Sequence, residues 1–258
     1  MTPFVIKNKS NSLKINILNN LNRIKSVGLT LSILCIIFSF QSRAQAQYLV
    51  PNPTVNKALF TECVIHTGVN LWRNDHLNQL RIVGNTWQVG LIDNHAKTQY
   101  NSSMAHLSDG LALGTALASG VLTFTLPKNQ QSQYVQLAIQ NVWITANIAQ
   151  SVKMLALRNR PYTQAAGFVS TKIDDHFSFF SGHSAITATA ATTAILMAIN
   201  QQNMSNWGKV AAYSAGGLAL TTASLRIAAG KHYPSDVVTG ILVGVAVAVI
   251  NTHLHEAH

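Results

Sequence analysis

Three short segments of the chain combine basic residues, histidines and small residues in a pattern suited to phosphate chemistry. The first segment begins at Lys153 and ends at Arg160-Pro161. Lys153 and Arg160 are seven residues apart, which in a helix amounts to two turns. We therefore predict that both cations project from one helix face, about 10 Å apart along the axis. Two cations on an apolar stripe indicate a bound anion, and a pair of solvated bases is the alternative for this segment alone.

The second segment, Ser181-Gly182-His183, leads directly into an apolar stretch that we predict to be helical over 184–200. The first turn of a helix offers free backbone N–H groups and the positive end of the helix dipole, both of which suit a phosphate. His183 would then lie beside the bound anion. The alternative is that Ser181 is an ordinary N-cap.

The third segment contains Arg226, His232 and Asp236. Arg226 lies near the end of one predicted helix and Asp236 in the first turn of the next, so His232 is predicted in the loop between them. Asp236 could accept a hydrogen bond from one ring nitrogen of His232, which would leave the other nitrogen free as a nucleophile. A structural histidine beside a helix-start acid is the alternative.

Apolar residues at three- and four-residue steps predict that helices position these segments. The fold class is therefore all-α, a helical bundle with the active site formed at helix ends and the loops between them. We predict short helices and loops over residues 47–107 and a single domain over 47–258. The predicted helices cover 110–126, 134–157, 184–200, 209–225 and 235–252.

The positive charge of the chain is concentrated at its start. The 258 residues are 48% hydrophobic and only 10% charged, with a net charge of +10. Residues 1–46 carry six bases and no acid, which leaves +4 on the rest. A domain with so few clustered bases is not a nucleic-acid binder.

The first 46 residues also predict export. Residues 27–40 form an uncharged, mostly apolar run, and Ala44 and Ala46 have the spacing that a signal peptidase accepts. We predict a signal peptide over 1–46 and a periplasmic or cell-envelope protein, a retained anchor helix being the alternative. After cleavage Cys63 is the only cysteine, so no disulfide can form within the chain.

Residues 110–127 and 237–254 each run without a charge for a length close to that of a membrane span. Their helices are nevertheless rich in small and polar residues. These residues favour a soluble or peripherally attached bundle over one embedded in the membrane.

Together the three segments resemble the signature of the type 2 phosphatidic acid phosphatase and vanadium haloperoxidase superfamily, which reads KxxxxxxRP, PSGH and SRxxxxxHxxxD. The resemblance in helix order extends over about 109–252. Phe180 stands where the family usually has Pro, and Leu225 where it usually has Ser. The Phe180 departure is expected to loosen the turn or to give the site a more apolar rim. The matching positions are Lys153, Arg160 and Pro161, then Ser181, Gly182 and His183, then Arg226, His232 and Asp236.

The resemblance implies a phosphatase that needs no metal and no cofactor. His232, oriented by Asp236, would attack phosphorus to give a phosphohistidine, while His183 would protonate the leaving group and then activate water. The remaining positions implied to bind the phosphoryl oxygens are Lys153, Arg160, Ser181, Gly182 and Arg226.

The implied substrates are lipid phosphates, isoprenyl pyrophosphates or small soluble phosphates, with substrate choice depending on residues 47–127. Two other functions remain open for the same fold. One is a vanadium-dependent haloperoxidase, which the short mature domain of 212 residues disfavours, and the other is a non-catalytic anion-binding or membrane-assembly protein. The eight further histidines have no metal-ligand spacing. Three of these, His253, His255 and His258, are expected to be solvated.

Overall fold

The computed structural model describes residues 53–79 and 84–255, so the predicted leader and His258 lie outside the described residues. All regular structure in these two ranges is helical, which confirms the all-α prediction. The α-helices are α2 (Pro53–Gln79), α3 (Ser102–Val121), α4 (Lys128–Ala156), α5 (Gly182–Asn200), α6 (Asn206–Ala228) and α7 (Pro234–Leu254). Short 3-10 helices are η2 (Gly90–His95), η3 (Leu122–Thr125), η4 (Pro161–Gln164) and η5 (Ile173–His176).

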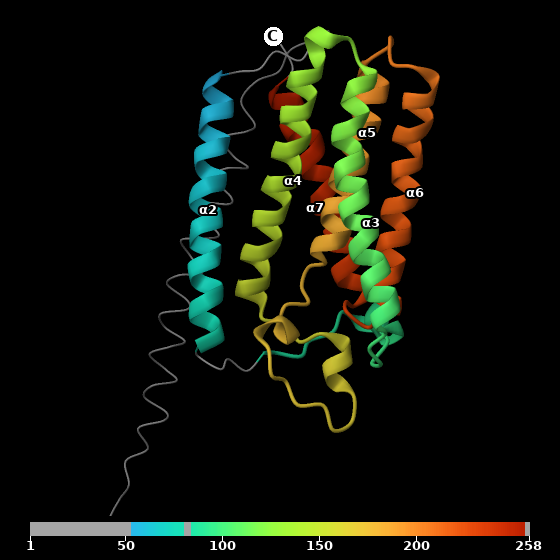
Figure 1. Ribbon diagram of the computed structural model, residues 1–258. Helices are drawn as coiled ribbons and strands as arrows, with labels where there is room; N and C mark the ends of the chain where they lie inside the picture. Colours follow the sequence, from blue (N-terminus) through green and yellow to red (C-terminus); the bar gives the residue numbers. More distant parts are fainter. Residues whose placement is uncertain (1–52, 80–83, 256–258) are drawn as a thin grey trace, which may run out of the picture. The chain divides into compact units, whose positions relative to one another are not determined.

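Helix α5 is the centre of the bundle, with α3, α4, α6 and α7 packed around it (Figure 1). Its packing depends on small residues. A Cβ atom on Gly240 of α7 would lie 2.6 Å from the carbonyl oxygen of Ser181, and one on Gly244 would overlap the carbonyl of Ala185. Glycine at these two positions therefore lets α7 approach the backbone of α5 closely.

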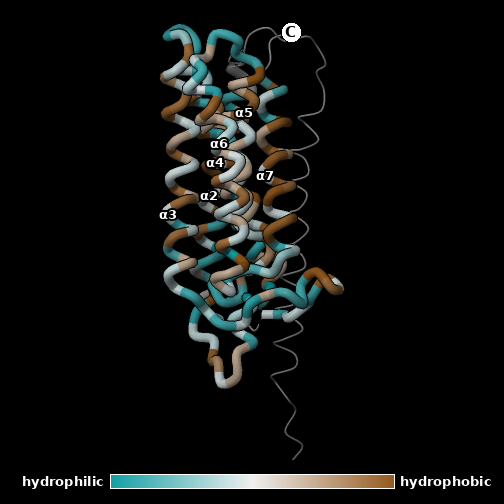
Figure 2. Tube along the Cα trace, turned by 90° about the vertical axis from the view of Figure 1, so that its right-hand side faces the viewer, coloured by the Kyte–Doolittle hydropathy of each residue, from teal (hydrophilic) through white to brown (hydrophobic). Residues whose placement is uncertain are grey.

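Small residues face the interior and large apolar residues face outward. On α6, the buried positions Ala212, Ala215 and Ala219 share one helix face, whereas Val210 and Leu220 are exposed. The apolar colouring continues along α3 and α7 in Figure 2. On those two helices the exposed large side chains are Met104, Leu107, Leu113, Leu117, Val121, Val238, Leu242 and Val245.

This distribution indicates that the protein associates with a membrane. Ser102–Thr125, Gly182–Asn200 and Pro234–Leu254 are long and apolar enough to cross one. Only 28% of the first segment and 33% of the third are buried, against 67% of the central one. The preference for a soluble bundle rested on small residues, and these residues pack in the interior instead of covering the surface.

Three local predictions differ from the structure. Residues 53–79 form one long helix, α2, instead of short helices and loops, because its scattered polar side chains are matched by polar partners on α4. Thr67, for example, donates to Asn147 Oδ1 at 3.1 Å. His255, expected to be solvated, is buried, and its Nε2 lies 2.8 Å from Asn56 Oδ1. Phe180 packs against Ala149 in the interior instead of forming a rim.

We expect Gly244→Ala to lower the free energy of unfolding by about 1–3 kcal/mol, because the new methyl group forces α7 away from α5. The matched control is Gly217→Ala. Gly217 lies on the exposed side of α6, and no atom lies within 4 Å of the place its new methyl group would take, so this change is expected to be neutral or slightly stabilising. Thermal unfolding midpoints of the two purified variants measure the difference, and equal midpoints would contradict the close packing.

Candidate active site

The three motif segments meet at one end of the bundle, the lower end in Figure 1. Helix α4 ends there with Lys153 in its last turn, and α6 ends there with Arg226. Helices α5 and α7 both begin at the same end. Two cationic helix ends therefore face two helix N-termini, an arrangement that favours an anion between them.

Lys153 and Arg160 do not share a helix face, which corrects the prediction. Leu157 adopts a left-handed conformation with φ 45° and ends α4. Arg160 lies beyond this turn, in an extended conformation just before η4. The two cations are brought together by the turn after α4 instead of by helical periodicity.

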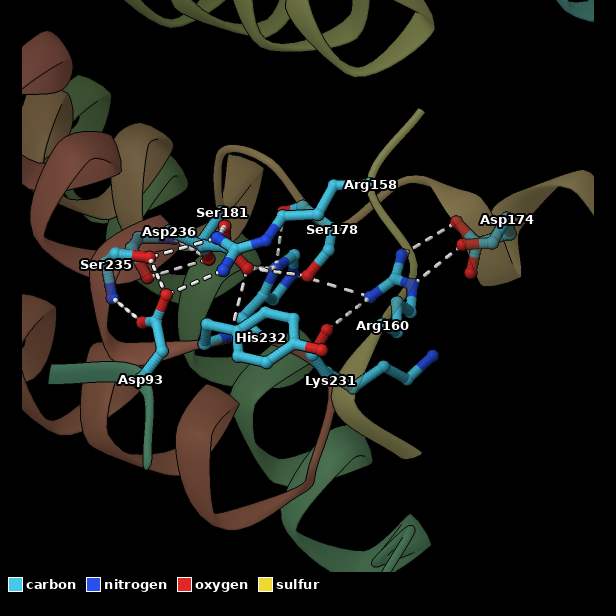
Figure 3. A network of polar contacts seen from close by, with 12 residues as sticks. Asp93, Arg158, Arg160, Asp174, Ser178, Ser181, Lys231, His232, Ser235 and Asp236 are labelled. Atoms are coloured by element: carbon cyan, nitrogen blue, oxygen red, sulfur yellow. Dashed lines mark hydrogen bonds and ion pairs between the residues drawn. The ribbon is translucent and has the colours of Figure 1, made fainter. Parts of the chain in front are cut away.

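Arg158 makes four side-chain hydrogen bonds in the site, and it was not among the predicted site residues. Its side chain is fully buried. It donates to Asp93 Oδ2 at 2.6 Å and to Asp236 Oδ1, so one guanidinium joins η2 to the start of α7 (Figure 3). The rings of Trp87 and Tyr233 each have their centroid 3.9 Å from its central carbon. Arg158 could have been recognised from the sequence, because it lies between two predicted site bases in a domain with few charges. No sequence feature identified Asp93 as a residue of the site.

His232 is completely buried, and its hydrogen bonding differs from the prediction. Its Nδ1 lies 2.7 Å from the carbonyl oxygen of Ser178 and 3.7 Å from Asp236 Oδ2. Asp236 instead accepts hydrogen bonds from Ser178 Oγ at 2.5 Å and from the backbone N–H of Tyr233 at 2.9 Å. Because a carbonyl can only accept, Nδ1 carries the proton and Nε2 keeps its lone pair.

The unprotonated Nε2 of His232 faces cations and accepts a hydrogen bond from Arg160. It lies 3.4 Å from a terminal nitrogen of Arg160. Burial, together with the charges of Arg160, Arg226 and Lys153, holds the pKa of His232 well below its ordinary value. The ring is therefore neutral at pH 7, the state in which an imidazole acts as a nucleophile.

Both arginines of the predicted cradle contact half-exposed acids. Arg160 donates to Asp174 Oδ1 at 2.7 Å, and Arg226 donates to Asp109 Oδ1 at 2.6 Å. The Nε of Arg226 is buried and has no hydrogen-bond partner within the described residues. Sequence reasoning had not placed Asp109 or Asp174 in the site.

Lys153 lies beside the N-terminus of α5. A Cβ atom on Gly182 would be 3.2 Å from its Nζ, so the glycine leaves room for the ammonium at the helix end. Burial and the neighbouring charges of Arg160 and Arg226 lower the pKa of Lys153 to about 8. A partly neutral amine at this position gains a full charge when an anion binds next to it.

Ser181 and His183, both at this helix start, differ in burial and in their partners. Ser181 is buried, and its Oγ caps α5 through Ser184, with 2.8 Å between the two hydroxyl oxygens. Ser181 is therefore an N-cap of α5, which was the alternative that the sequence left open for it. His183 Nε2 lies 3.0 Å from Asp109 Oδ1 at the more open side. Within the described residues no group of three or more His, Cys, Asp or Glu side chains forms a metal site.

The family comparison agrees with this geometry. The profile of the PAP2 superfamily matches residues 135–258, which include all three motif segments. No curated protein and no solved structure matches the chain. The acids that contact Arg158 and Arg226 from earlier in the chain, Asp93 and Asp109, lie outside the matched range.

We expect Arg158→Gln to lower the free energy of unfolding by about 3–5 kcal/mol, because it leaves two buried carboxylates without their common cation. For a domain of this size such a loss lowers the unfolding midpoint by roughly 10 °C. Lys97→Gln removes one exposed charge from the same end of the bundle and serves as the control. An unchanged midpoint for Arg158→Gln would show that the buried pairs contribute nothing to stability.

Proposed function

Through residues 135–258 the chain belongs to the PAP2 superfamily, and on that premise we propose that it is a metal-independent phosphatase that works through a phosphohistidine. The substrates are phosphate monoesters or pyrophosphates. The observation that carries the proposal is the unprotonated Nε2 of buried His232, which accepts a hydrogen bond from Arg160 and lies near the charges of Arg226 and Lys153.

The three cations bind the phosphoryl oxygens of the substrate. Asp109 and Asp174 are each about half exposed, so an incoming phosphate can displace them from Arg226 and Arg160. The phosphate also gains the unpartnered Nε–H of Arg226 and the N–H groups at the start of α5. These donors stabilise the negative charge spread over the oxygens in the transition state.

In the first step, Nε2 of His232 attacks phosphorus as the bond to the leaving oxygen breaks. The carbonyl of Ser178 holds the ring by accepting a hydrogen bond from Nδ1, and it stabilises the positive charge that develops on the ring. His183 donates its proton to the leaving oxygen. Burial and the charge of Arg226 lower the pKa of His183 to about 3 in the protein without substrate. The negative charges of the bound phosphate and of Asp109 oppose this shift and favour the protonated form.

In the second step, His183 removes a proton from water, and the water oxygen attacks phosphorus. The P–N bond breaks, inorganic phosphate leaves, and the lone pair returns to Nε2 of His232. Asp236 does not act on the substrate in this scheme. It positions the loop of His232 through Ser178, Tyr233 and Arg158.

His232→Ala is expected to lower kcat on p-nitrophenyl phosphate by roughly 10³-fold or more, because the nucleophile is lost. After acid-free quenching, wild-type protein incubated with ³²P-labelled substrate is expected to retain an acid-labile, alkali-stable label that His232→Ala lacks. His106→Ala, which removes an exposed histidine of α3, is the control. Retained hydrolysis by His232→Ala would rule out the phosphohistidine route.

The pH dependence of kcat/KM tests the role of Lys153. Since the pKa of Lys153 in the free protein is about 8, kcat/KM is expected to fall above that pH as the ammonium loses its proton. Lys153→Arg keeps its charge at all these pH values, so the fall is expected to move upward by at least about one pH unit. An identical alkaline limb in the two proteins would remove Lys153 from the cradle.

We also propose that the protein is exported to the cell envelope and that its substrate is anchored in the membrane. The predicted leader and the outward apolar faces of α3 and α7 support this location. Washing membranes with alkaline carbonate is expected to leave the protein in the membrane fraction, while detergent releases it. Release by carbonate alone would contradict the membrane location.

A further inference from the structure

A groove of about 760 Å³ lies between α2 and the first half of α4, away from the candidate active site. Helix α4 runs from this groove to Lys153, and its start lies at the upper end of Figure 1. Trp143, the groove residue of α4 nearest to Lys153 in sequence, precedes it by ten residues, or about 15 Å along the helix. The groove is therefore a separate feature from the phosphate cradle.

The groove exists because α2 and α4 are joined most closely toward the other end of α2. There Asn70 Nδ2 donates to the carbonyl oxygen of Asn147 at 3.3 Å, and Ser151 Oγ donates to Asn70 Oδ1 at 3.1 Å. At the groove itself, Gln140 Nε2 donates to Asn56 Oδ1 at 2.9 Å. Between these contacts aromatic and aliphatic side chains line an open space instead of closing it.

Aromatic and aliphatic side chains line the groove together with polar ones such as Gln131, Ser132 and Gln136, and two lysines lie at its beginning. Phe60 and Trp143 meet edge to face with their ring centroids 5.6 Å apart. Phe60, Phe124 and Ile139 are 60%, 65% and 58% exposed, so this apolar wall is open to the surroundings. In a protein that associates with a membrane, such an opening faces hydrocarbon chains.

Lys57 of α2 and Lys128, the first residue of α4, supply the positive charge of the groove. Both side chains are exposed, and no ion pair joins either one to an acid within the described residues. Among the residues that the structure describes, no Asp or Glu lines the groove. The first turn of α4 also has no acidic residue and no side-chain cap, which leaves the positive end of its dipole uncompensated.

We propose that this groove binds one anionic phospholipid, with an acyl chain along Phe60, Ile139 and Trp143 and the lipid phosphate on Lys57 and Lys128. The charge complementarity selects an anionic headgroup, and the exposed apolar side chains select a molecule with a long chain. No histidine that could attack phosphorus or transfer a proton is found in the described lining of the groove. The lipid is therefore bound without being cleaved.

Trp143 provides a local probe for this lipid. The full-length protein in detergent micelles is titrated with phosphatidylglycerol carrying brominated acyl chains, and separately with brominated phosphatidylcholine, while tryptophan fluorescence is recorded. Phosphatidylglycerol is expected to half-saturate the quenching at a concentration at least about fivefold lower, since it presents a net anion to two lysines. The quenching is expected to be lost in Trp143→Phe.

The lysines are tested with Lys57→Gln/Lys128→Gln, which is expected to raise the phosphatidylglycerol midpoint to that of phosphatidylcholine. The matched control is Lys209→Gln, because Lys209 is a partly exposed base near the start of α6, outside the groove. This control is expected to keep the preference. Unchanged p-nitrophenyl phosphate hydrolysis by the double variant shows that its fold is intact. A failure of the lipid-binding proposal can therefore be distinguished from a failure of the proposed phosphatase function.

Three results would each overturn the proposal. The first is equal midpoints for the two lipids in the wild-type protein, which would indicate ordinary annular lipid. The second is a preference that survives in the double variant or falls equally in Lys209→Gln. The third is quenching that persists in Trp143→Phe, because the lipid would then lie against another tryptophan.

Discussion

The geometry of the candidate site depends on one buried guanidinium. Arg158 holds Asp93 and Asp236 together in the interior, with Trp87 and Tyr233 stacked on its two faces. A buried charge that lost either partner would carry a large desolvation cost. The pairing therefore ties the turn after α4 to η2 and to the first turn of α7, the elements that frame the loop of His232.

This constraint also explains how the nucleophile is oriented. Because Asp236 is engaged by Arg158, Ser178 and Tyr233, it does not accept the Nδ1 proton of His232. The carbonyl of Ser178 accepts it instead, and the Ser178 hydroxyl links that residue back to Asp236. The carboxylate thus acts on the imidazole through a neighbouring residue, and Nε2 remains available among the cations.

The packing of the bundle also differs from expectation, because small residues fill its interior and larger apolar residues face outward. Alanines and glycines form the interior around α5, where Gly244 allows backbone contact, while larger side chains such as Leu242 face outward. In lipid, close packing and interhelical hydrogen bonds hold helices together, since burying apolar surface gains little there. The buried bond from Asn141 to Thr193 at 2.9 Å fits that rule. The proposed chemistry takes place at one end of the bundle, and the groove proposed to bind lipid lies separately, beside α2.

The sequence alone determined the helices from α5 onward and the identity of the chemical groups. Apolar periodicity predicted α5, α6 and α7 to within three residues at each end, and the three short segments that contain Lys153, His183 and His232 indicated a phosphate site. Those features are local, because each depends on residues within a few turns. Only the tertiary structure decided which acid meets which base. Asp93 reaches Arg158 from 65 residues away, and such a pairing leaves no local pattern in the chain.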